Sequence, residues 1–102
     1  MFTRAELRRH DGRDGAAIYV AVNDLVHDMS AAAHFYGPGG AYGFLAGRDG
    51  TVALAKFSLD PRVLDSAPQW RLEDFDEGEI ASLANYARRF KEKYPIVGRL
   101  KR

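Results

Sequence analysis

The chain has 102 residues, 46% of them hydrophobic, which suits a single domain over residues 1–102 with one core. Its 15 basic and 14 acidic residues form no aromatic-studded basic stripe, so we expect no nucleic-acid partner. The lack of cysteine excludes disulfides, iron–sulfur clusters and thiolate zinc sites. The longest early apolar run, residues 16–22, is far short of the roughly 20 residues of a membrane helix, so we expect a soluble chain.

The first predicted element is a short helix over residues 4–10. Thr3 and Glu6 have the spacing of a capping box, in which each side chain satisfies a free backbone N–H of the first turn. Phe2 precedes the cap as a staple residue, and Gly12 can end the helix.

A hairpin follows, with predicted strands at residues 18–22 and 25–29. The strands are rich in β-branched residues and flank an Asn-Asp pair typical of tight turns. Ser30 is then placed to cap a brief helical turn at residues 31–33.

The middle of the chain is predicted to be mostly irregular. Glycines stand at 37, 39, 40, 43, 47 and 50, and we expect them to let the backbone approach something flat. Residues 51–57 are predicted to form a short helix. Pro61 and Pro68 then interrupt a surface connector that carries Trp70 and Leu72 back onto the core.

The longest predicted helix starts at a second capping box, Asp76 and Glu79. Its apolar face has helical periodicity and consists of Ile80, Leu83, Ala84, Ala87, Phe90 and Tyr94. Pro95 ends it, and residues 96–100 are predicted to be a final strand that joins the hairpin. The basic tail that ends in Arg102 is expected to be a solvated end.

Several kinds of chemistry find little support in the sequence. The hydroxyl residues weighed as nucleophiles (Thr3, Ser30, Thr51 and Ser58) stand at cap or ordinary positions, without a histidine placed as base. The histidines lack metal-site spacing, and the pair His27-Asp28 alone is weak support for zinc. No lysine followed by serine or threonine comes after the glycine run, which disfavours a phosphate cradle. We therefore expect no enzyme.

The stretch FYGPGGAYGFLAG, residues 35–47, is predicted to hold a ligand. Tyr36 and Tyr42 flank its glycines, with Arg48 and Asp49 as a polar exit; the apolar walls are Phe35, Phe44 and Leu45. A phenol at the edge of an apolar cleft can hydrogen-bond a steroid-like ligand or, when ionised, bind ferric iron. The alternative is that both tyrosines are core residues with satisfied hydroxyls.

Several blocks of the sequence resemble the membrane-associated progesterone receptor family. They are FTRAELRRHDG, IYVAVNDLVHDMS, FYGPGGAYGFLAGRDGT and YARRFKEKYPIVG, and the resemblance extends over residues 2–100. It implies an α+β, cytochrome b5-like fold, in which a small mixed sheet and short helices form a ligand cleft beside a long C-terminal helix. It also implies a haem- or steroid-binding domain.

The resemblance assigns roles to individual residues. Tyr42 matches the tyrosine that ligates haem iron, here ferric haem b, and Tyr36, Lys93 and Tyr94 match polar residues that line the site. Asp49 matches an acidic residue that supports the shape of the pocket. Cytochrome b5 proper uses two histidines, one in an HPGG turn, but this chain has YGPGG, which disfavours electron-carrier chemistry.

The chain departs from the family pattern at three positions: Tyr86 replaces a common tryptophan, Leu45 a phenylalanine and Gly50 an alanine. The best-known members have an N-terminal membrane anchor that this sequence does not show, so the resemblance implies the short, anchor-free kind or a trimmed form. We therefore expect a cytoplasmic protein or one peripheral to the endoplasmic reticulum membrane.

The leading hypothesis is a non-catalytic haem-binding module. The alternative is a haem-independent module that uses the same cleft for a sterol or a protein; a cytochrome b5-like electron carrier is the weakest. The resemblance implies haem-thiolate monooxygenases as partners and a haem-mediated homodimer.

Overall fold

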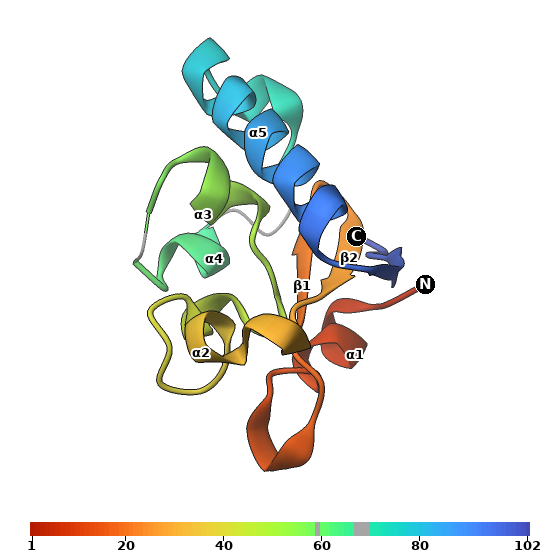
Figure 1. Cartoon of the computed structure of the whole chain (residues 1–102). Helices are drawn as coiled ribbons and strands as arrows, with labels where there is room; N and C mark the ends of the chain where they lie inside the picture. The colour runs from red at the N-terminus through yellow and green to blue at the C-terminus, as the bar shows by residue number, and fades with distance from the viewer. Residues whose placement is uncertain (59, 67–69) are drawn as a thin grey trace.

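The computed structural model describes residues 1–58, 60–66 and 70–102 (Figure 1). Within these ranges the strands form a four-stranded sheet in the order β3-β1-β2-β4. The strands are β1 (Tyr19–Val22), β2 (Leu25–Asp28), β3 (Arg48–Asp49) and β4 (Ile96–Arg99). β2 pairs antiparallel with β1 and β4, and β3 pairs parallel with β1. The sheet is therefore mixed, as predicted.

The α-helices are short except for the last. They are α1 (Arg4–Arg8), α2 (Ala33–Tyr36), α3 (Thr51–Ala55), α4 (Val63–Ser66) and α5 (Glu77–Lys93). Short 3₁₀ turns lie at Arg13–Gly15, Ser30–Ala32, Gly43–Leu45 and Leu72–Asp74. Both predicted capping boxes are confirmed, because Glu6 N donates to Thr3 Oγ1 at 3.1 Å and Glu79 N donates to Asp76 Oδ1 at 2.8 Å. α1 ends before His10, and α3 ends before residue 57.

The predicted hairpin and final strand are confirmed. Asn23 and Asp24 have φ values of 51° and 69°, the left-handed pair that a two-residue turn between twisted strands requires. β4 then pairs with β2, so the end of the chain returns to the hairpin. The glycine-rich segment contains more regular structure than predicted, because β3 adds to the free edge of β1 through Val20 and Ala21.

The sheet has apolar clusters on both faces, and Figure 1 shows α2, α3 and α4 on one side of the hairpin and α1 on the other. The smaller cluster contains Leu7, Ala21, Val26 and Leu100. The larger one joins Val20 and Val22 to α3 and α5; its other buried members include Met29, Leu45, Trp70, Phe75, Leu83 and Phe90. This larger cluster lies directly behind the aromatic stretch.

Three expectations about side chains were wrong. Leu72 is 54% exposed, because Phe75 fills the core position beside Trp70 instead. The predicted apolar face of α5 is narrower than expected, because Ala84 is exposed and Ile80, in the first turn of the helix, is 40% exposed. Ser30 caps nothing in the described structure; its Oγ accepts a hydrogen bond from Ile18 N at 3.1 Å. Pro68, expected to interrupt the connector, lies outside the described residues.

The basic tail is exposed at Arg99, Lys101 and Arg102, as expected, but Arg102 also contacts the rest of the fold. Its guanidinium lies 3.8 Å from the centre of the Trp70 ring and donates to the Trp70 carbonyl. Its Nε also lies 2.8 Å from Asp24 Oδ1. The end of the chain therefore covers Trp70 and pairs with the hairpin turn.

Candidate functional site

A compact loop after α2 positions the two tyrosines of the aromatic stretch. Tyr42 N donates to the Phe35 carbonyl at 2.9 Å, and Gly40 N donates to the Gly37 carbonyl at 3.0 Å. A Cβ on Gly40 would lie 2.4 Å from the Phe35 carbonyl oxygen, so only glycine fits there. The close approach predicted for these glycines is thus an approach of the loop to its own backbone, which returns Tyr42 to the end of α2.

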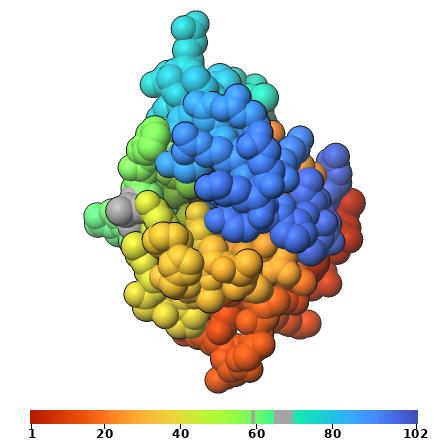
Figure 2. Space-filling view, viewed as in Figure 1, coloured from red at the N-terminus to blue at the C-terminus, as the bar shows by residue number. Residues whose placement is uncertain are grey.

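The Tyr36 and Tyr42 side chains stack against each other. Their ring centres are 5.6 Å apart, with 28° between the planes. Tyr36 also makes edge contacts with Phe90 and Tyr94, at 6.2 Å and 6.3 Å. Figure 2 shows the yellow segment that carries the tyrosines directly against the blue end of α5. The loop and the helix end therefore form one aromatic cluster.

The two phenols differ in environment. Tyr36 is partly buried, and burial, together with the neighbouring Tyr94 and Tyr42 hydroxyls, raises the pKa of its phenol to about 12. Tyr42 is 38% exposed, and its hydroxyl forms no hydrogen bond with any described residue. Tyr42 thus presents an accessible oxygen, and Tyr36 stays a neutral donor.

A cleft of about 250 Å³ opens beside Tyr42. Its lining is mostly apolar and consists of Tyr42, Phe44, Leu45, Ala53, Leu54, Phe57, Ser58 and Tyr86. Leu45, Ala53 and Leu54 form its buried floor, whereas Phe57 is 74% exposed at its rim. The predicted walls Phe44 and Leu45 are present, but Phe35 lies outside the cleft, 48% exposed.

Phe57 and Tyr86 belong to this cleft but were not predicted as site residues. Their rings meet at 5.8 Å with 65° between the planes. Tyr86 stands four residues before Phe90, so helical spacing places it on the face of α5 that carries the aromatic cluster. No pattern in the sequence indicates Phe57, which follows α3 with φ of 53°, an uncommon conformation for a bulky residue.

Lys93 and Tyr94 lie at the end of α5, on the Tyr36 side of the cluster. Tyr94 is half-buried and contacts both Tyr36 and Phe90, the latter at 5.5 Å. Lys93 is exposed as the last residue of the helix. Neither residue lines the cleft itself. Tyr94 is connected with the cleft through Tyr36, which stacks on the cleft residue Tyr42.

Asp49 lies at the base of α3, away from the cleft. Its Oδ1 accepts from Thr51 Oγ1 at 2.6 Å and from Thr51 N at 3.1 Å, while its Oδ2 accepts from Trp70 Nε1 at 2.9 Å. Thr51 Oγ1 in turn accepts from Asn23 N at 2.9 Å. The carboxylate therefore joins β3, α3, the hairpin turn and Trp70.

The predicted polar exit at Arg48 and Asp49 was wrong. These residues line a separate small cleft with Arg4, Arg8 and other residues, and Tyr42 is not among them. The cause is the short β3 strand, which carries both residues to the edge of the sheet beside α1.

Histidine and carboxylate groups do not assemble a metal site in the part of the chain that the structure describes. His27 is 1% exposed and packs edge-on against Phe90 at 5.6 Å. Burial lowers the pKa of its imidazole, since a charge there would be poorly solvated. Asp28 Oδ1 accepts from Ser30 N instead.

Comparison with known proteins identifies the class. The family described as "Cytochrome b5-like Heme/Steroid binding domain" matches residues 3–101. The chain belongs to this family. A solved structure of a hypothetical Arabidopsis thaliana protein with a cytochrome b5 like fold superposes with a TM-score of 0.84 at 36% identity, over 99% of this chain and 90% of that one. The predicted fold is thereby confirmed.

Curated relatives agree with the resemblance seen in the sequence. Human membrane-associated progesterone receptor component 2 is 40% identical over 97% of this chain and 44% of its own length. The Arabidopsis thaliana protein named Probable steroid-binding protein 3 is 39% identical over 97% and 96%. Cytochrome P-450 regulator dap1 of Schizosaccharomyces pombe is 31% identical over 97% and 61%.

The chain thus spans less than half of the human relative and nearly all of the Arabidopsis one. Across residues 1–58, 60–66 and 70–102, no helix combines the length and the hydropathy needed to cross a membrane.

Proposed function

We propose that this chain is a non-catalytic haem-binding module in which the Tyr42 phenolate ligates ferric haem b. The observation that carries the proposal is an exposed phenol without a hydrogen-bond partner among the described residues, at the mouth of an apolar cleft. The family of cytochrome b5-like haem/steroid-binding domains supports the choice of ligand class.

The residues present fit a haem group. Leu45, Ala53 and Leu54 offer a buried apolar floor, and Phe57 and Tyr86 offer aromatic surfaces for a flat ring. The iron's own charge stabilises a phenolate near neutral pH, although the free side chain has a pKa of about 10. When bound, an anionic oxygen ligand favours ferric over ferrous iron and lowers the reduction potential, which suits haem storage, transfer or sensing.

Tyr36 lies beside the proposed iron ligand, Tyr42, and does not compete with it for the iron. Its phenol, whose pKa of about 12 reflects burial, stays protonated and can donate a hydrogen bond toward the bound group. Tyr94 holds the other side of Tyr36 through the edge contact at 6.3 Å. Lys93, exposed at the helix end, supplies a positive charge for a haem propionate.

Asp49 supports the site from behind. Its bonds to Thr51 hold the first turn of α3, and α3 supplies Ala53 and Leu54 to the cleft floor. The proposed role is therefore structural support of the pocket, without contact with haem.

A second candidate is a haem-independent module that binds a sterol or a protein in the same cleft. The observation that favours it is the large exposed aromatic surface around the cleft mouth, at Phe35, Tyr42 and Phe57. Relatives named as steroid-binding proteins support the sterol form of this proposal.

The same surface supports a proposal about partners. The exposed Phe35, which lies beside Tyr42, and Phe57 at the cleft rim offer apolar surface that a second copy of the chain could cover when haem is bound, giving a haem-mediated homodimer. The relative named as a cytochrome P-450 regulator supports haem-thiolate monooxygenases as partners. We propose that the chain lies in the cytoplasm or at the periphery of the endoplasmic reticulum membrane.

Titration of the purified chain with hemin separates the two candidates. The haem proposal predicts a saturable absorbance change with one hemin per chain, and sterol added in excess should displace hemin only if the two share the cleft. Sterol binding with no saturable hemin change would support the second candidate and contradict the first.

A further inference from the structure

A second and larger cavity is lined by glycines 39, 40, 43 and 47 of the glycine-rich segment. Its volume is about 440 Å³, within the range of small-molecule sites. It is lined by Arg8, Asp11, Arg13, Arg48 and Phe44 and by several proline, glycine and apolar residues. Tyr42 and Phe57 do not line it, so it is separate from the proposed haem cleft and shares only the Phe44 wall with it.

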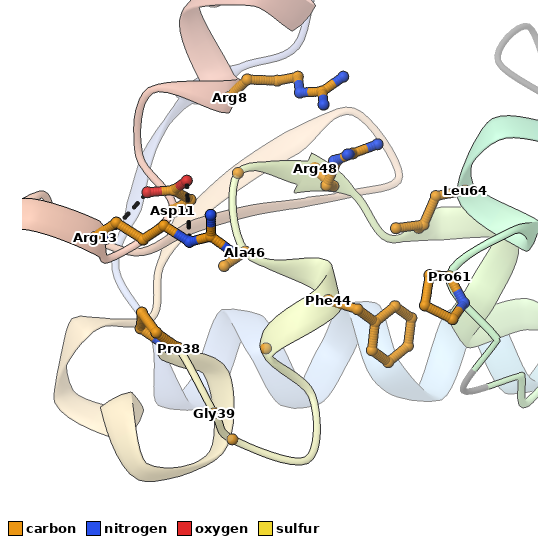
Figure 3. Close-up of a pocket in the computed structure, with 13 residues that line it drawn as sticks. Arg8, Asp11, Arg13, Pro38, Gly39, Phe44, Ala46, Arg48, Pro61 and Leu64 are labelled. Atoms are coloured by element: carbon orange, nitrogen blue, oxygen red, sulfur yellow. Dashed lines mark hydrogen bonds and ion pairs between the residues drawn. The ribbon is translucent and has the colours of Figure 1, made fainter.

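The cavity arises from the close packing of α1 on the loop. Gly47 has φ of 71°, and a Cβ there would lie 3.2 Å from Arg8 Cα. This approach brings Arg8, at the end of α1, to the same cavity as Arg48 of β3, and Figure 3 shows both side chains extending in the same direction over it.

The cavity has a charged part and an apolar part. Figure 3 places Phe44, Pro61 and Leu64 together at one end. The Asp11–Arg13 turn lies at the opposite side, and the Arg8 and Arg48 side chains lie along the upper edge of the view. A ligand that fills the cavity therefore meets guanidinium groups and an apolar wall together.

The electrostatic balance of the lining is positive, with three arginines against one aspartate. Asp11 is already engaged by Arg13, through a hydrogen bond from Arg13 N at 3.0 Å and an ion pair at 4.0 Å. Arg8 forms no ion pair or hydrogen bond with any described residue through its side chain. Guanidinium groups bind oxyanions in a bidentate manner, so Arg8 has the chemistry to hold one.

We propose that this cavity binds a small organic oxyanion, the phosphate or sulfate ester of an apolar alcohol. Arg8 holds the anionic group, Arg48 adds positive charge beside it, and Phe44, Pro61 and Leu64 pack against the apolar body. The site is distinct from the proposed iron site, because Phe44 is the one residue that lines both cavities and Tyr42 does not line this one.

The test is a two-dimensional ¹H–¹⁵N NMR titration of the haem-free chain with phenyl phosphate, with inorganic phosphate and phenol as the two halves of the probe. We expect saturable shifts of the Gly39, Gly43 and Gly47 amides, which line the cavity. Arg8→Gln should weaken phenyl phosphate binding at least about tenfold, as expected for a lost charge-assisted hydrogen-bond pair. Each half of the probe should bind more weakly than the whole.

Arg9→Gln is the matched control, because Arg9 is the exposed neighbour of Arg8 and does not line the cavity. It should leave phenyl phosphate binding unchanged, and Tyr42→Phe should do the same. Equal losses in the Arg8 and Arg9 variants would overturn the proposal, as would shifts confined to the Tyr42 cleft. If the chain binds vesicles that contain phosphatidic acid but does not bind phenyl phosphate, the proposal of a small soluble ester as the ligand is overturned.

Discussion

Tyr42 stacks on Tyr36 at 5.6 Å, yet the two phenols face opposite surroundings, one reaching solvent and the other lying within an aromatic cluster. The outer phenol can therefore be reached by a metal, whereas burial keeps the inner one protonated. The proposed division of roles, with Tyr42 as the iron ligand and Tyr36 as the hydrogen-bond donor, rests on this difference.

Tyr36→Phe keeps the ring stack and removes only the inner hydroxyl. We expect hemin to bind this variant less than about tenfold more weakly, because a single neutral hydrogen bond contributes about 1 kcal/mol. The absorbance spectrum of the bound hemin should stay that of the wild type. A loss of the wild-type spectrum in this variant would assign the ligand role to Tyr36.

Asp49→Ala should lower the free energy of unfolding by about 3 kcal/mol, because Thr51 and Trp70 lose a charged acceptor. Urea denaturation measures the loss, and the fluorescence of Trp70, the chain's sole tryptophan, reports the altered surroundings of the indole. Asp60→Ala is the control, since that carboxylate pairs with Arg62 at the surface. If the two variants lose equal stability, the network around Asp49 does not hold α3.

The buried His27 should make stability fall as the pH drops below about 6.5, the value for an unperturbed histidine. Burial lowers the pKa of His27 in the folded state. As the pH falls, the unfolded chain therefore takes up the proton first and is stabilised relative to the folded chain. Between pH 7 and pH 5 the urea midpoint should decrease, and His27→Leu should reduce that decrease. His34→Gln, at an exposed site, should leave it unchanged; an undiminished decrease in the His27 variant would contradict this account.

Arg102→Ala should destabilise the fold by about 1–2 kcal/mol, because the cation–π contact with Trp70 and the hydrogen bond to its carbonyl are lost. Thermal unfolding compares it with Lys101→Ala, an exposed neighbour for which we expect no change. Equal unfolding temperatures for both variants would mean that the contacts of Arg102 contribute nothing to the stability of the fold.

Local patterns predicted the parts of the fold that local interactions determine. The capping boxes at Thr3 and Asp76 and the turn at Asn23 each depend on residues within one turn of chain, so their spacing sufficed. By contrast, Leu72 and Phe75 are both apolar residues of one connector. Only the path of the chain determines which of them enters the core.

The site was predictable only in part for the same reason. Glycine and aromatic crowding indicated a ligand stretch, but spacing alone did not distinguish the exposed Tyr42 from the inner Tyr36; the family resemblance made that distinction. Phe57 joins the cleft through the end of α3, and Arg8 and Arg48 meet through the packing of α1 on the loop. These are contacts between segments distant in sequence, which periodicity does not encode.

The measurement that tests the central claim most directly is the absorbance and electron paramagnetic resonance spectrum of hemin bound to Tyr42→Phe. The wild type should give a high-spin ferric, tyrosinate-type spectrum, and the variant, which keeps the ring and loses only the hydroxyl, should lose it. A wild-type spectrum in Tyr42→Phe would contradict the assignment of Tyr42 as the iron ligand.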